Sequence, residues 1–293
     1  MGFLVCIDGK TMRGTMATVP VLDRGFLYGD SVYEVIRTYG GRPFAVSEHL
    51  DRLQRSARRL HIDLPERAWL EDQVDRTIAE SKNPESYCRI IVTRGSGPIT
   101  LDPTRAEKPM TVILVKELES FDRWMYEEGI SLYVPDIRRN PPSALDPAIK
   151  SGNYLNSVLA LGEARRAGYD DALLLGTDGV VTESTSANVF AYYKKENTFC
   201  TPALAAGILE GVTRGLLLKL AKQAGIDCRE CDLSLEELLV ADEVMLSGTL
   251  KEVMPVAEIG GERIGDGNPG PVAKKLLGML RTHALAANEV NEK

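Results

Sequence analysis

The stretch Pro147-Ala-Ile-Lys-Ser-Gly-Asn-Tyr-Leu155 joins a proline-rich loop to an apolar helix, which the spacing of its residues predicts over 153–167. Lys150 lies at this junction. A lysine flanked by small and apolar residues can lose hydration, which lowers its pKa and makes the neutral amine a nucleophile. An ordinary exposed loop lysine is the competing interpretation, and residues elsewhere in the chain decide between the two.

The chain before this junction predicts a sheet with two helices. Runs rich in Val, Ile and Tyr predict the strands, and apolar residues at helical spacing predict the helices. The strands are expected at 3–8, 31–38, 87–93 and 110–115, and the helices at 48–61, with Ser47 as N-cap, and at 67–81. Charged and aromatic residues then interrupt the pattern at 117–126, which favours a linker.

The chain after the linker predicts a second sheet with its own helices. The strands are expected at 130–134, 172–175, 180–183, 188–193 and 243–247, and the helices at 153–167, 211–224, after the capping box Ser234–Glu237, and from Pro271 to about 286. This order predicts an α+β protein of two domains, each a sheet with packed helices. The expected parts are a small N-terminal α/β domain at 1–120, a linker at 121–129, a large C-terminal domain at 130–287 and a polar tail at 288–293.

Composition excludes several classes of protein. Of the 293 residues, 44% are apolar and 26% charged, which excludes disorder for the bulk of the chain. Subtracting 42 acidic from 35 basic residues gives −7, so no overall positive field attracts nucleic acid or an anionic membrane. No apolar run approaches the roughly 20 residues of a membrane helix, and the start lacks the basic leader of a signal peptide. We expect a cytoplasmic protein with no nucleic-acid and no membrane partner.

The sequence gives little support for a disulfide framework, a zinc site, a dinucleotide loop or a Ser/His/Asp triad. Five cysteines are an odd number, which argues against a secreted disulfide framework, and Cys228-x-x-Cys231 has no second ligand pair for zinc. The G-x-G-x-x-G of 265–270 follows a short polar segment and is interpreted as a turn. Only three histidines are present, and none lies near a G-x-S-x-G, which disfavours Ser/His/Asp catalysis and a histidine-based metal site. No metal is expected.

Polar residues at element ends could serve Lys150 as partners. Glu183 ends a strand among small residues, where it could hold a proton on a heterocyclic nitrogen or cap backbone amides. The helix that begins near 211 offers backbone amides and Thr213 to an anion. Thr249 adds a hydroxyl after the last strand, and Arg52 could add the positive charge. Each also has an ordinary structural interpretation, but together they describe a phosphate cup, an acid for a pyridine nitrogen and an amine for a Schiff base, as pyridoxal phosphate requires.

The sequence resembles the fold-type IV pyridoxal-phosphate enzymes: the class IV branched-chain aminotransferases, D-amino-acid aminotransferases and aminodeoxychorismate lyases. The resemblance runs from Asp8 to about Ala284, nearly the whole chain. The matching motifs are Leu27-Tyr-Gly-Asp-Ser-Val-Tyr-Glu34, Glu48-His-Leu-Asp-Arg-Leu53, Lys150-Ser-Gly-Asn-Tyr-Leu155, Val181-Thr-Glu183, Ala187-Asn-Val-Phe190, Gly211-Val-Thr-Arg214 and Ser247-Gly-Thr249.

This resemblance implies a role for each matching residue. Lys150 would be the catalytic residue that binds pyridoxal 5′-phosphate covalently and moves a proton between substrate and cofactor. Tyr154 would hydrogen-bond the phenolic oxygen, and Glu183 would pair with the pyridinium nitrogen. The phosphate ligands would be Arg52, Thr213, Thr249 and the backbone of Val212. The resemblance also implies ping-pong kinetics with amino acids and 2-oxo acids, and a homodimer in which loops of one subunit close the site of the other.

The substrate motifs are mixed. Tyr87-x-Arg89 and Tyr154 resemble the branched-chain enzymes, in which such a Tyr-x-Arg serves substrate carboxylates. Tyr33-Glu-Val35 resembles the D-specific enzymes, Ser186-Ala-Asn188 replaces Gly-Glu-Asn, and Leu250-Lys251 replaces a pair of alanines. Lys251 is expected to bind a substrate carboxylate or to point to solvent.

The reaction expected from the resemblance is transamination between a branched-chain L-amino acid and 2-oxoglutarate. The first alternative is a D-amino-acid transaminase with activity on (R)-amines, and the second is a lyase that eliminates pyruvate. A cofactor-binding protein without catalysis is disfavoured, because Lys150, Tyr154 and Glu183 are all present.

Overall fold

The computed structural model describes residues 3–290, with backbone alone at 288–290, and these residues form two compact units. Unit 1 contains the chain up to Glu119, the segment Ile149–Asn153 and the chain from Ala284. Unit 2 contains Ser120–Ala148 and Tyr154–His283. The segment with Lys150 therefore groups with the N-terminal part of the chain, although it lies far from that part in sequence.

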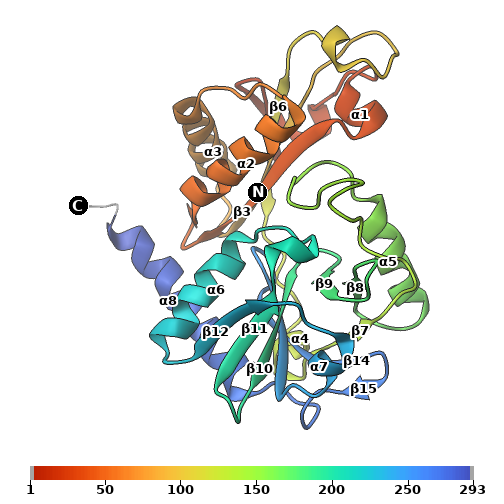
Figure 1. The fold of residues 1–293 in the computed structure, drawn as a ribbon. Helices are drawn as coiled ribbons and strands as arrows, with labels where there is room; N and C mark the ends of the chain where they lie inside the picture. The colour runs from red at the N-terminus through yellow and green to blue at the C-terminus, as the bar shows by residue number, and fades with distance from the viewer. Residues whose placement is uncertain (1–2, 291–293) are drawn as a thin grey trace. The chain divides into compact units, whose positions relative to one another are not determined.

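Unit 1 is built on an antiparallel sheet of six strands in the order β2-β1-β6-β5-β3-β4. Figure 1 labels β3 and β6 of this sheet and the helices α2 and α3. Its strands are β1 (Leu4–Ile7), β2 (Lys10–Arg13), β3 (Ser31–Tyr39), β4 (Arg42–Pro43), β5 (Ser86–Thr93) and β6 (Met110–Glu117). Its helices are α1 (Arg24–Tyr28), α2 (Val46–Leu60), α3 (Arg67–Ser81) and the 3-10 turns Gly14–Met16 and Pro103–Arg105. Helix α2 packs on β3, and α3 packs on β6 and β1.

The strands predicted at 31–38, 87–93 and 110–115 are confirmed as β3, β5 and β6. In β5 the side chains of Cys88, Ile90 and Val92 are fully buried and belong to the apolar cluster that includes Leu53 of α2 and Val74 of α3. Because successive side chains of a strand point to opposite faces, the odd-numbered residues of β5 face away from these helices. The sheet therefore has a helix-covered face and an opposite face.

The predicted cap of α2 is wrong. The helix begins at Val46, and its N-cap is Ala45, which has a left-handed φ of 56° and makes no side-chain cap. The hairpin of β3 and β4 ends at Pro43 and the helix begins at Val46, so Ser47 lies inside the first turn. Its hydroxyl instead accepts a hydrogen bond from Arg67 Nη2 (2.8 Å).

Unit 2 is built on a sheet of nine strands in the order β12-β11-β10-β13-β14-β7-β8-β9, with β15 paired to β14. Its strands are β7 (Ile130–Tyr133), β8 (Asp171–Leu175), β9 (Val181–Ser184), β10 (Asn188–Tyr193), β11 (Thr198–Pro202), β12 (Asp227–Cys231), β13 (Glu243–Gly248), β14 (Glu252–Ile259) and β15 (Glu262–Arg263). Its helices are α4 (Trp124–Glu127), α5 (Leu155–Arg166), the 3-10 turn Leu204–Ala206, α6 (Val212–Gln223), α7 (Leu235–Leu239) and α8 (Pro271–Val290).

One further pairing closes part of this sheet into a ring. Glu183 of β9 pairs with Asn188 of β10, so β10, β13, β14, β7, β8 and β9 follow one another and return to β10. Each strand of the ring sends an apolar side chain into one buried cluster. These side chains are Leu132, Leu173, Val181, Val189, Leu246 and Met254.

Some elements differ from the sequence-based expectations. The polar strand β12 carries Cys228 and Cys231, and β14 contains Pro255, so neither shows a strand pattern. Helix α4 lies within the expected linker 121–129. The expected tail, 288–293, is helical as far as Val290, and residues 291–293 lie outside the described residues. The capping box of Ser234 and Glu237 is confirmed.

The G-x-G-x-x-G of 265–270 is a turn, as predicted. Gly265 and Gly267 have φ of 56° and 82°, and the first amides of α8 are already occupied. Buried Glu243 accepts hydrogen bonds from Val272 N (3.0 Å) and Ala273 N (2.8 Å). A Cβ on Gly270 would lie 2.0 Å from Glu243 Cδ, so any other residue there would displace this carboxylate. This helix end binds a carboxylate of its own chain. Across residues 3–290, no helix is long and apolar enough to cross a membrane.

The Glu243→Ala variant tests the role of this carboxylate. Loss of the cap should lower the free energy of unfolding by roughly 1–2 kcal/mol, which corresponds to a fall of about 3–6 °C in melting temperature. Glu262→Ala, which changes an exposed carboxylate of β15, is the control and should melt as the wild type does. Equal melting of all three proteins in a calorimeter would contradict the assignment.

Candidate active site

The backbone around Lys150 is fixed from two sides within unit 1. Tyr33 N of β3 donates to Lys150 O (3.0 Å), and Gly152 N donates to Ser31 O (3.0 Å), so the segment lies along the start of β3. Lys150 N donates to Ser56 Oγ of α2 (3.0 Å). The exposed loop lysine considered from the sequence is therefore not what the structure contains. Lys150 occupies a defined position beside β3.

The Lys150 amine and the Arg89 guanidinium both lie close to the aromatic ring of Tyr33. Its Nζ lies 4.5 Å from the ring centroid of Tyr33, and Arg89 Cζ lies 4.0 Å from the same centroid. Tyr33 is buried, and Arg89 Nε is buried without a hydrogen-bond partner among the described residues. A buried donor without an acceptor is costly, so this arrangement suits an anionic ligand beside Arg89.

Four predicted substrate residues share one face of the unit 1 sheet. Val35 of β3 lies opposite Arg89 of β5 in the antiparallel register. Tyr33 is two residues before Val35, and Tyr87 is two residues before Arg89, so the strand period places all four on the same side. This face is opposite the one that α2 covers.

Arg52, predicted as a phosphate ligand, is buried on the helix-covered side. Its Nε donates to Glu34 Oε1 (2.7 Å) and its Nη2 to Glu34 Oε2 (2.8 Å). His49 Nδ1 donates to the same Oε2 (2.7 Å). Burial alone would raise the pKa of Glu34, but the Arg52 charge and the hydrogen bonds outweigh it and lower this pKa to about 2. Glu34 and His49 both lie in motifs of the resemblance, but neither was assigned a role from the sequence, because only the fold brings them to Arg52.

Glu183 lies at the strand pair that closes the ring in unit 2. Its Oε1 accepts from Arg139 Nη2 (2.7 Å), and its Oε2 accepts from Asn188 Nδ2 (3.1 Å) and from Leu209 N (3.1 Å). A cation and two N–H donors favour the ionised carboxylate, even at 6% exposure. Arg139 was not identified from the sequence, because it lies in a loop 44 residues before its partner.

The start of α6 offers backbone amides to an anion. Its N-cap is Gly211, and no side chain caps this helix of 12 residues in the described structure. A Cβ on Gly211 would lie 2.1 Å from Asn188 Oδ1, so glycine is required for this approach. Val212 and Thr213 form the first turn, where N–H groups and the helix dipole favour a negative charge.

The strand β13 adds hydroxyl groups to this part of unit 2. Ser247 lies opposite Asn188 in the register of β13 and β10, and its Oγ is buried without a partner among residues 3–290. Thr249 follows the strand in a partly exposed turn. The uncapped helix start, the unsatisfied hydroxyl and the paired Glu183 fit the phosphate and ring nitrogen of a pyridoxal cofactor.

The remaining predicted residues of unit 2 are Tyr154, Leu250 and Lys251. Tyr154 is partly buried and is the N-cap of α5, while Leu250 is partly buried in the turn after Thr249. The Lys251 ammonium lies 2.5 Å from Asp171 Oδ2, and its side chain is 15% exposed. Lys251 therefore does not extend freely into solvent.

The predicted site residues thus form two groups. Unit 1 contains Lys150, Arg52, Tyr33, Val35, Tyr87 and Arg89. Unit 2 contains Tyr154, Glu183, Val212, Thr213, Thr249, Leu250 and Lys251.

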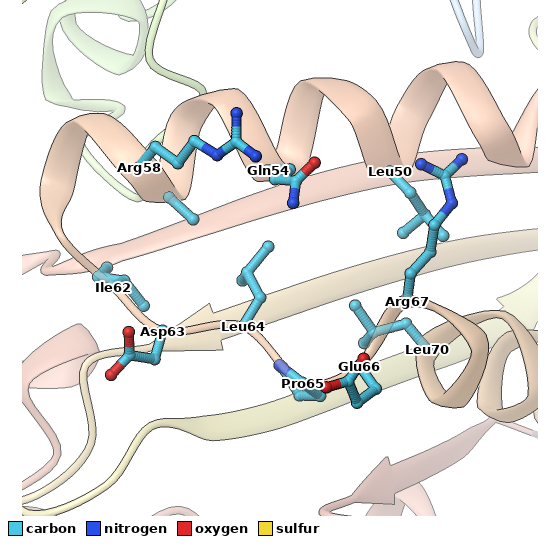
Figure 2. Close-up of a pocket in the computed structure, with 11 residues that line it drawn as sticks. Leu50, Gln54, Arg58, Ile62, Asp63, Leu64, Pro65, Glu66, Arg67 and Leu70 are labelled. Carbon is cyan, nitrogen blue, oxygen red and sulfur yellow. The ribbon is translucent and has the colours of Figure 1, made fainter.

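A cavity of about 390 Å³ in unit 1 lies apart from the predicted residues. Figure 2 shows Gln54 and Arg58 on α2 above it and Leu64 pointing into it from the loop before α3. Leu50 and Leu70 from the apolar core also line it. It opens between the helices, and none of the predicted site residues borders it.

Comparison with known proteins gives consistent matches. The family model for class IV amino-transferases matches residues 31–259. A Methanocaldococcus jannaschii protein, provisionally named branched-chain-amino-acid aminotransferase, is 40% identical over 273 residues, 93% of each chain. The D-alanine aminotransferase of Bacillus licheniformis is 34% identical over 283 residues, 96% of this chain and 97% of its own. A solved branched-chain amino acid aminotransferase from T.th., complexed with N-(5′-phosphopyridoxyl)-L-glutamate, has a TM-score of 0.90 and 29% identity, covering 97% of this chain and 94% of its own.

The Glu34→Gln variant tests the buried ion pair with Arg52. The folded pKa of about 2 lies below the ordinary value of 4.5, so the ionised carboxylate stabilises the fold above pH 4.5 and less as the pH falls toward 2. The variant should lose roughly 3 kcal/mol or more of unfolding free energy at pH 7, and its stability should depend less on pH in this range. Urea unfolding at several pH values measures both effects.

Glu80→Gln, on the exposed side of α3, is the matched control and should keep the wild-type pH dependence. Parallel stability curves for Glu34→Gln and the wild type between pH 6 and 3 would contradict the assignment.

Proposed function

Because the chain belongs to the class IV amino-transferase family, we propose that it transfers an amino group between a branched-chain L-amino acid and 2-oxoglutarate. The position of Lys150 carries this proposal, since its backbone is bonded to β3 and α2 and its amine lies over Tyr33. The relative with 40% identity supports the branched-chain substrate, and the glutamate adduct of the solved relative supports the acceptor.

The cofactor of this reaction is pyridoxal 5′-phosphate. When bound, it supplies an aldehyde carbon for amine exchange and a ring that takes up the electron pair released at the substrate Cα. Lys150 would hold that aldehyde carbon covalently and, once displaced, would accept the substrate Cα proton and deliver it to the same carbon of the cofactor. Glu183 would hold a proton at the ring nitrogen, and Tyr154 would bind the phenolic oxygen. The phosphate ligands would be Arg52, Thr213, Thr249 and the Val212 amide.

The substrate would meet the face of the unit 1 sheet that carries Arg89. Its guanidinium, with a buried Nε that lacks a partner among the described residues, would bind a substrate carboxylate, assisted by Tyr87. Tyr33, Val35 and Leu250 would contact the aliphatic side chain. Two half-reactions on one site then alternate, which gives ping-pong kinetics.

A D-amino-acid transaminase is the second candidate. The D-alanine aminotransferase with 34% identity over nearly the whole chain supports it. Val35 and the pair Leu250-Lys251 also depart from the branched-chain motifs, so the shape of the substrate site decides between the two stereochemistries.

The working form would be a homodimer in the cytoplasm. Leu155, Val158 and Leu159 form an apolar stripe on α5 and are 75%, 57% and 56% exposed. In unit 1, Phe26 and Leu101 are 69% and 80% exposed. Large exposed apolar side chains at helical spacing favour burial against a second copy. The five cysteines are free thiols, which suits a reducing compartment.

The substrate is tested in half-reactions without an acceptor. L-leucine, D-alanine and (R)-1-phenylethylamine are added separately to the purified protein, and the visible absorption of the bound cofactor is followed. L-leucine should bleach it fastest, because Arg89 and Tyr87 suit an L-amino acid with an aliphatic side chain. Faster bleaching by D-alanine or the amine would favour the second candidate.

Borohydride reduction followed by peptide mass analysis gives a readout that does not depend on turnover. The cofactor should be attached to Lys150 and should be lost in Lys150→Ala but retained in Lys275→Ala, an exposed lysine of α8. A wild-type protein that takes up no cofactor would overturn the proposed function.

The homodimer is tested with Val158→Glu. A charge in the middle of the α5 stripe would have to be desolvated in the interface, so the variant should shift toward the 32.1 kDa monomer. Light scattering during size-exclusion chromatography measures the mass. Val240→Glu, at an isolated exposed residue, should remain dimeric. A monomeric wild type, or a dimeric Val158→Glu, would contradict the proposed interface.

A further inference from the structure

The turn between β13 and β14 is held at both ends. Gly248 pairs with Glu252 across the turn, and Glu252 adopts a φ of 54°, which is unfavourable for a residue other than glycine. Arg281 binds the Glu252 carboxylate (2.6 Å from Nη2 to Oε2). Lys251 O accepts from the Tyr126 hydroxyl (3.3 Å). This short turn also carries Thr249 and Leu250, so its conformation determines where both residues lie.

The Lys251 side chain links this turn by hydrogen bonds to two other segments of unit 2. Its Nζ donates to Asp171 Oδ2 (2.5 Å) at the start of β8 and to Ser186 Oγ (3.0 Å). Ser186 lies in the turn that follows Glu183. One ammonium group therefore connects the Thr249 turn with the Glu183 turn and with the first residue of β8.

Asp171 is a buried counter-charge for this ammonium. Its side chain is 3% exposed, and its Oδ1 accepts from Thr185 Oγ1 (2.5 Å) and Ala172 N (2.8 Å). Burial alone would raise the pKa of Asp171, but the Lys251 charge and these hydrogen bonds give a net lowering. The carboxylate is ionised at neutral pH, and loss of Lys251 would leave it buried without its cation.

We propose that Lys251 is a positioning residue whose bonds to Asp171 and Ser186 hold the turn that presents Thr249 to the phosphate of the cofactor. This inference rests on the proposed function, because Thr249 is a phosphate ligand only in that function. The Asp171 carboxylate neutralises the ammonium, so the turn meets an anion through hydroxyl and amide groups. Neither expectation from the sequence, a substrate ligand or a lysine in solvent, describes this role.

Thermal unfolding of the apoprotein tests the ion pair. Lys251→Met should lower the melting temperature by about 5–10 °C, because Asp171 remains buried without a cation. Asp171→Asn should lower it less, since the lysine can extend to water. The double variant should recover most of the loss. Lys195→Met, at an exposed lysine of unit 2, should melt as the wild type does.

Cofactor affinity separates positioning from simple charge compensation. Titration of the apoproteins with pyridoxal 5′-phosphate should give a dissociation constant about tenfold higher for Lys251→Met and for the double variant, but unchanged for Lys195→Met. The double variant is the decisive protein, because it regains stability without regaining the bonds that hold the turn. Recovery of wild-type affinity in the double variant would overturn the positioning role.

Hydrogen exchange of the apoproteins keeps the two proposals distinguishable. Amides of residues 249–253 should exchange about tenfold faster in the double variant than in the wild type. If the double variant exchanges faster but the wild type binds no cofactor, the proposed function is rejected, while the role of Lys251 in holding the turn is supported. If the double variant exchanges at the wild-type rate, Lys251 does not hold the turn, whatever the cofactor affinity of the variant.

Discussion

The pairing of Glu183 with Asn188 closes the ring of strands in unit 2, and the chemistry of that unit depends on this closure. It places a carboxylate where water is nearly excluded, which is unfavourable unless the charge is compensated. Arg139, Asn188 and the Leu209 amide supply that compensation. Asn188 Oδ1 also occupies the space that a Cβ at position 211 would need, which suits the glycine N-cap of α6, and no side chain of the described residues caps this helix. Asn188 therefore positions both the Glu183 carboxylate and the start of α6, the two groups that we propose to hold the cofactor.

Buried carboxylates with bound cations recur in both units: Glu34 with Arg52, Glu183 with Arg139, and Asp171 with Lys251. Such pairs add little net stability compared with apolar packing, because desolvation of both charges opposes their attraction. Their common property is geometric, since a carboxylate that accepts several bonds fixes the orientation of the cation. Each pair lies beside a residue that the resemblance assigns to the cofactor or includes one. Orientation of charged groups is therefore a better explanation for these pairs than stability.

Local patterns predicted the parts of this structure that depend on local rules. Runs of Val, Ile and Tyr predicted β3 and β5 to within one residue of their bounds, and the register of the structure then places Tyr33, Val35, Tyr87 and Arg89 on one face. Arg139 and Asp171 could not be found this way, because their partners lie 44 and 80 residues away and only the fold brings them together. Strands β12 and β14 were not predicted for another reason, because β12 is polar and β14 contains a proline. Pairing with neighbouring strands, rather than their own sequence, makes both segments strands.

The Lys251–Asp171 pair shows how a departure from a family motif can be accommodated. A lysine where the resemblance implies an alanine would, without a partner, bring a positive charge to the turn that carries Thr249. The carboxylate of Asp171 removes that net charge, while Ser186 and Thr185 satisfy the remaining polar atoms. Lys251 then adds bonds that hold the turn around Thr249 and Leu250, while Asp171 balances its charge. Selectivity among amino acids would accordingly arise from the packing of Leu250 and Val35, and carboxylate recognition would fall to Arg89, whose buried Nε has no acceptor among the described residues.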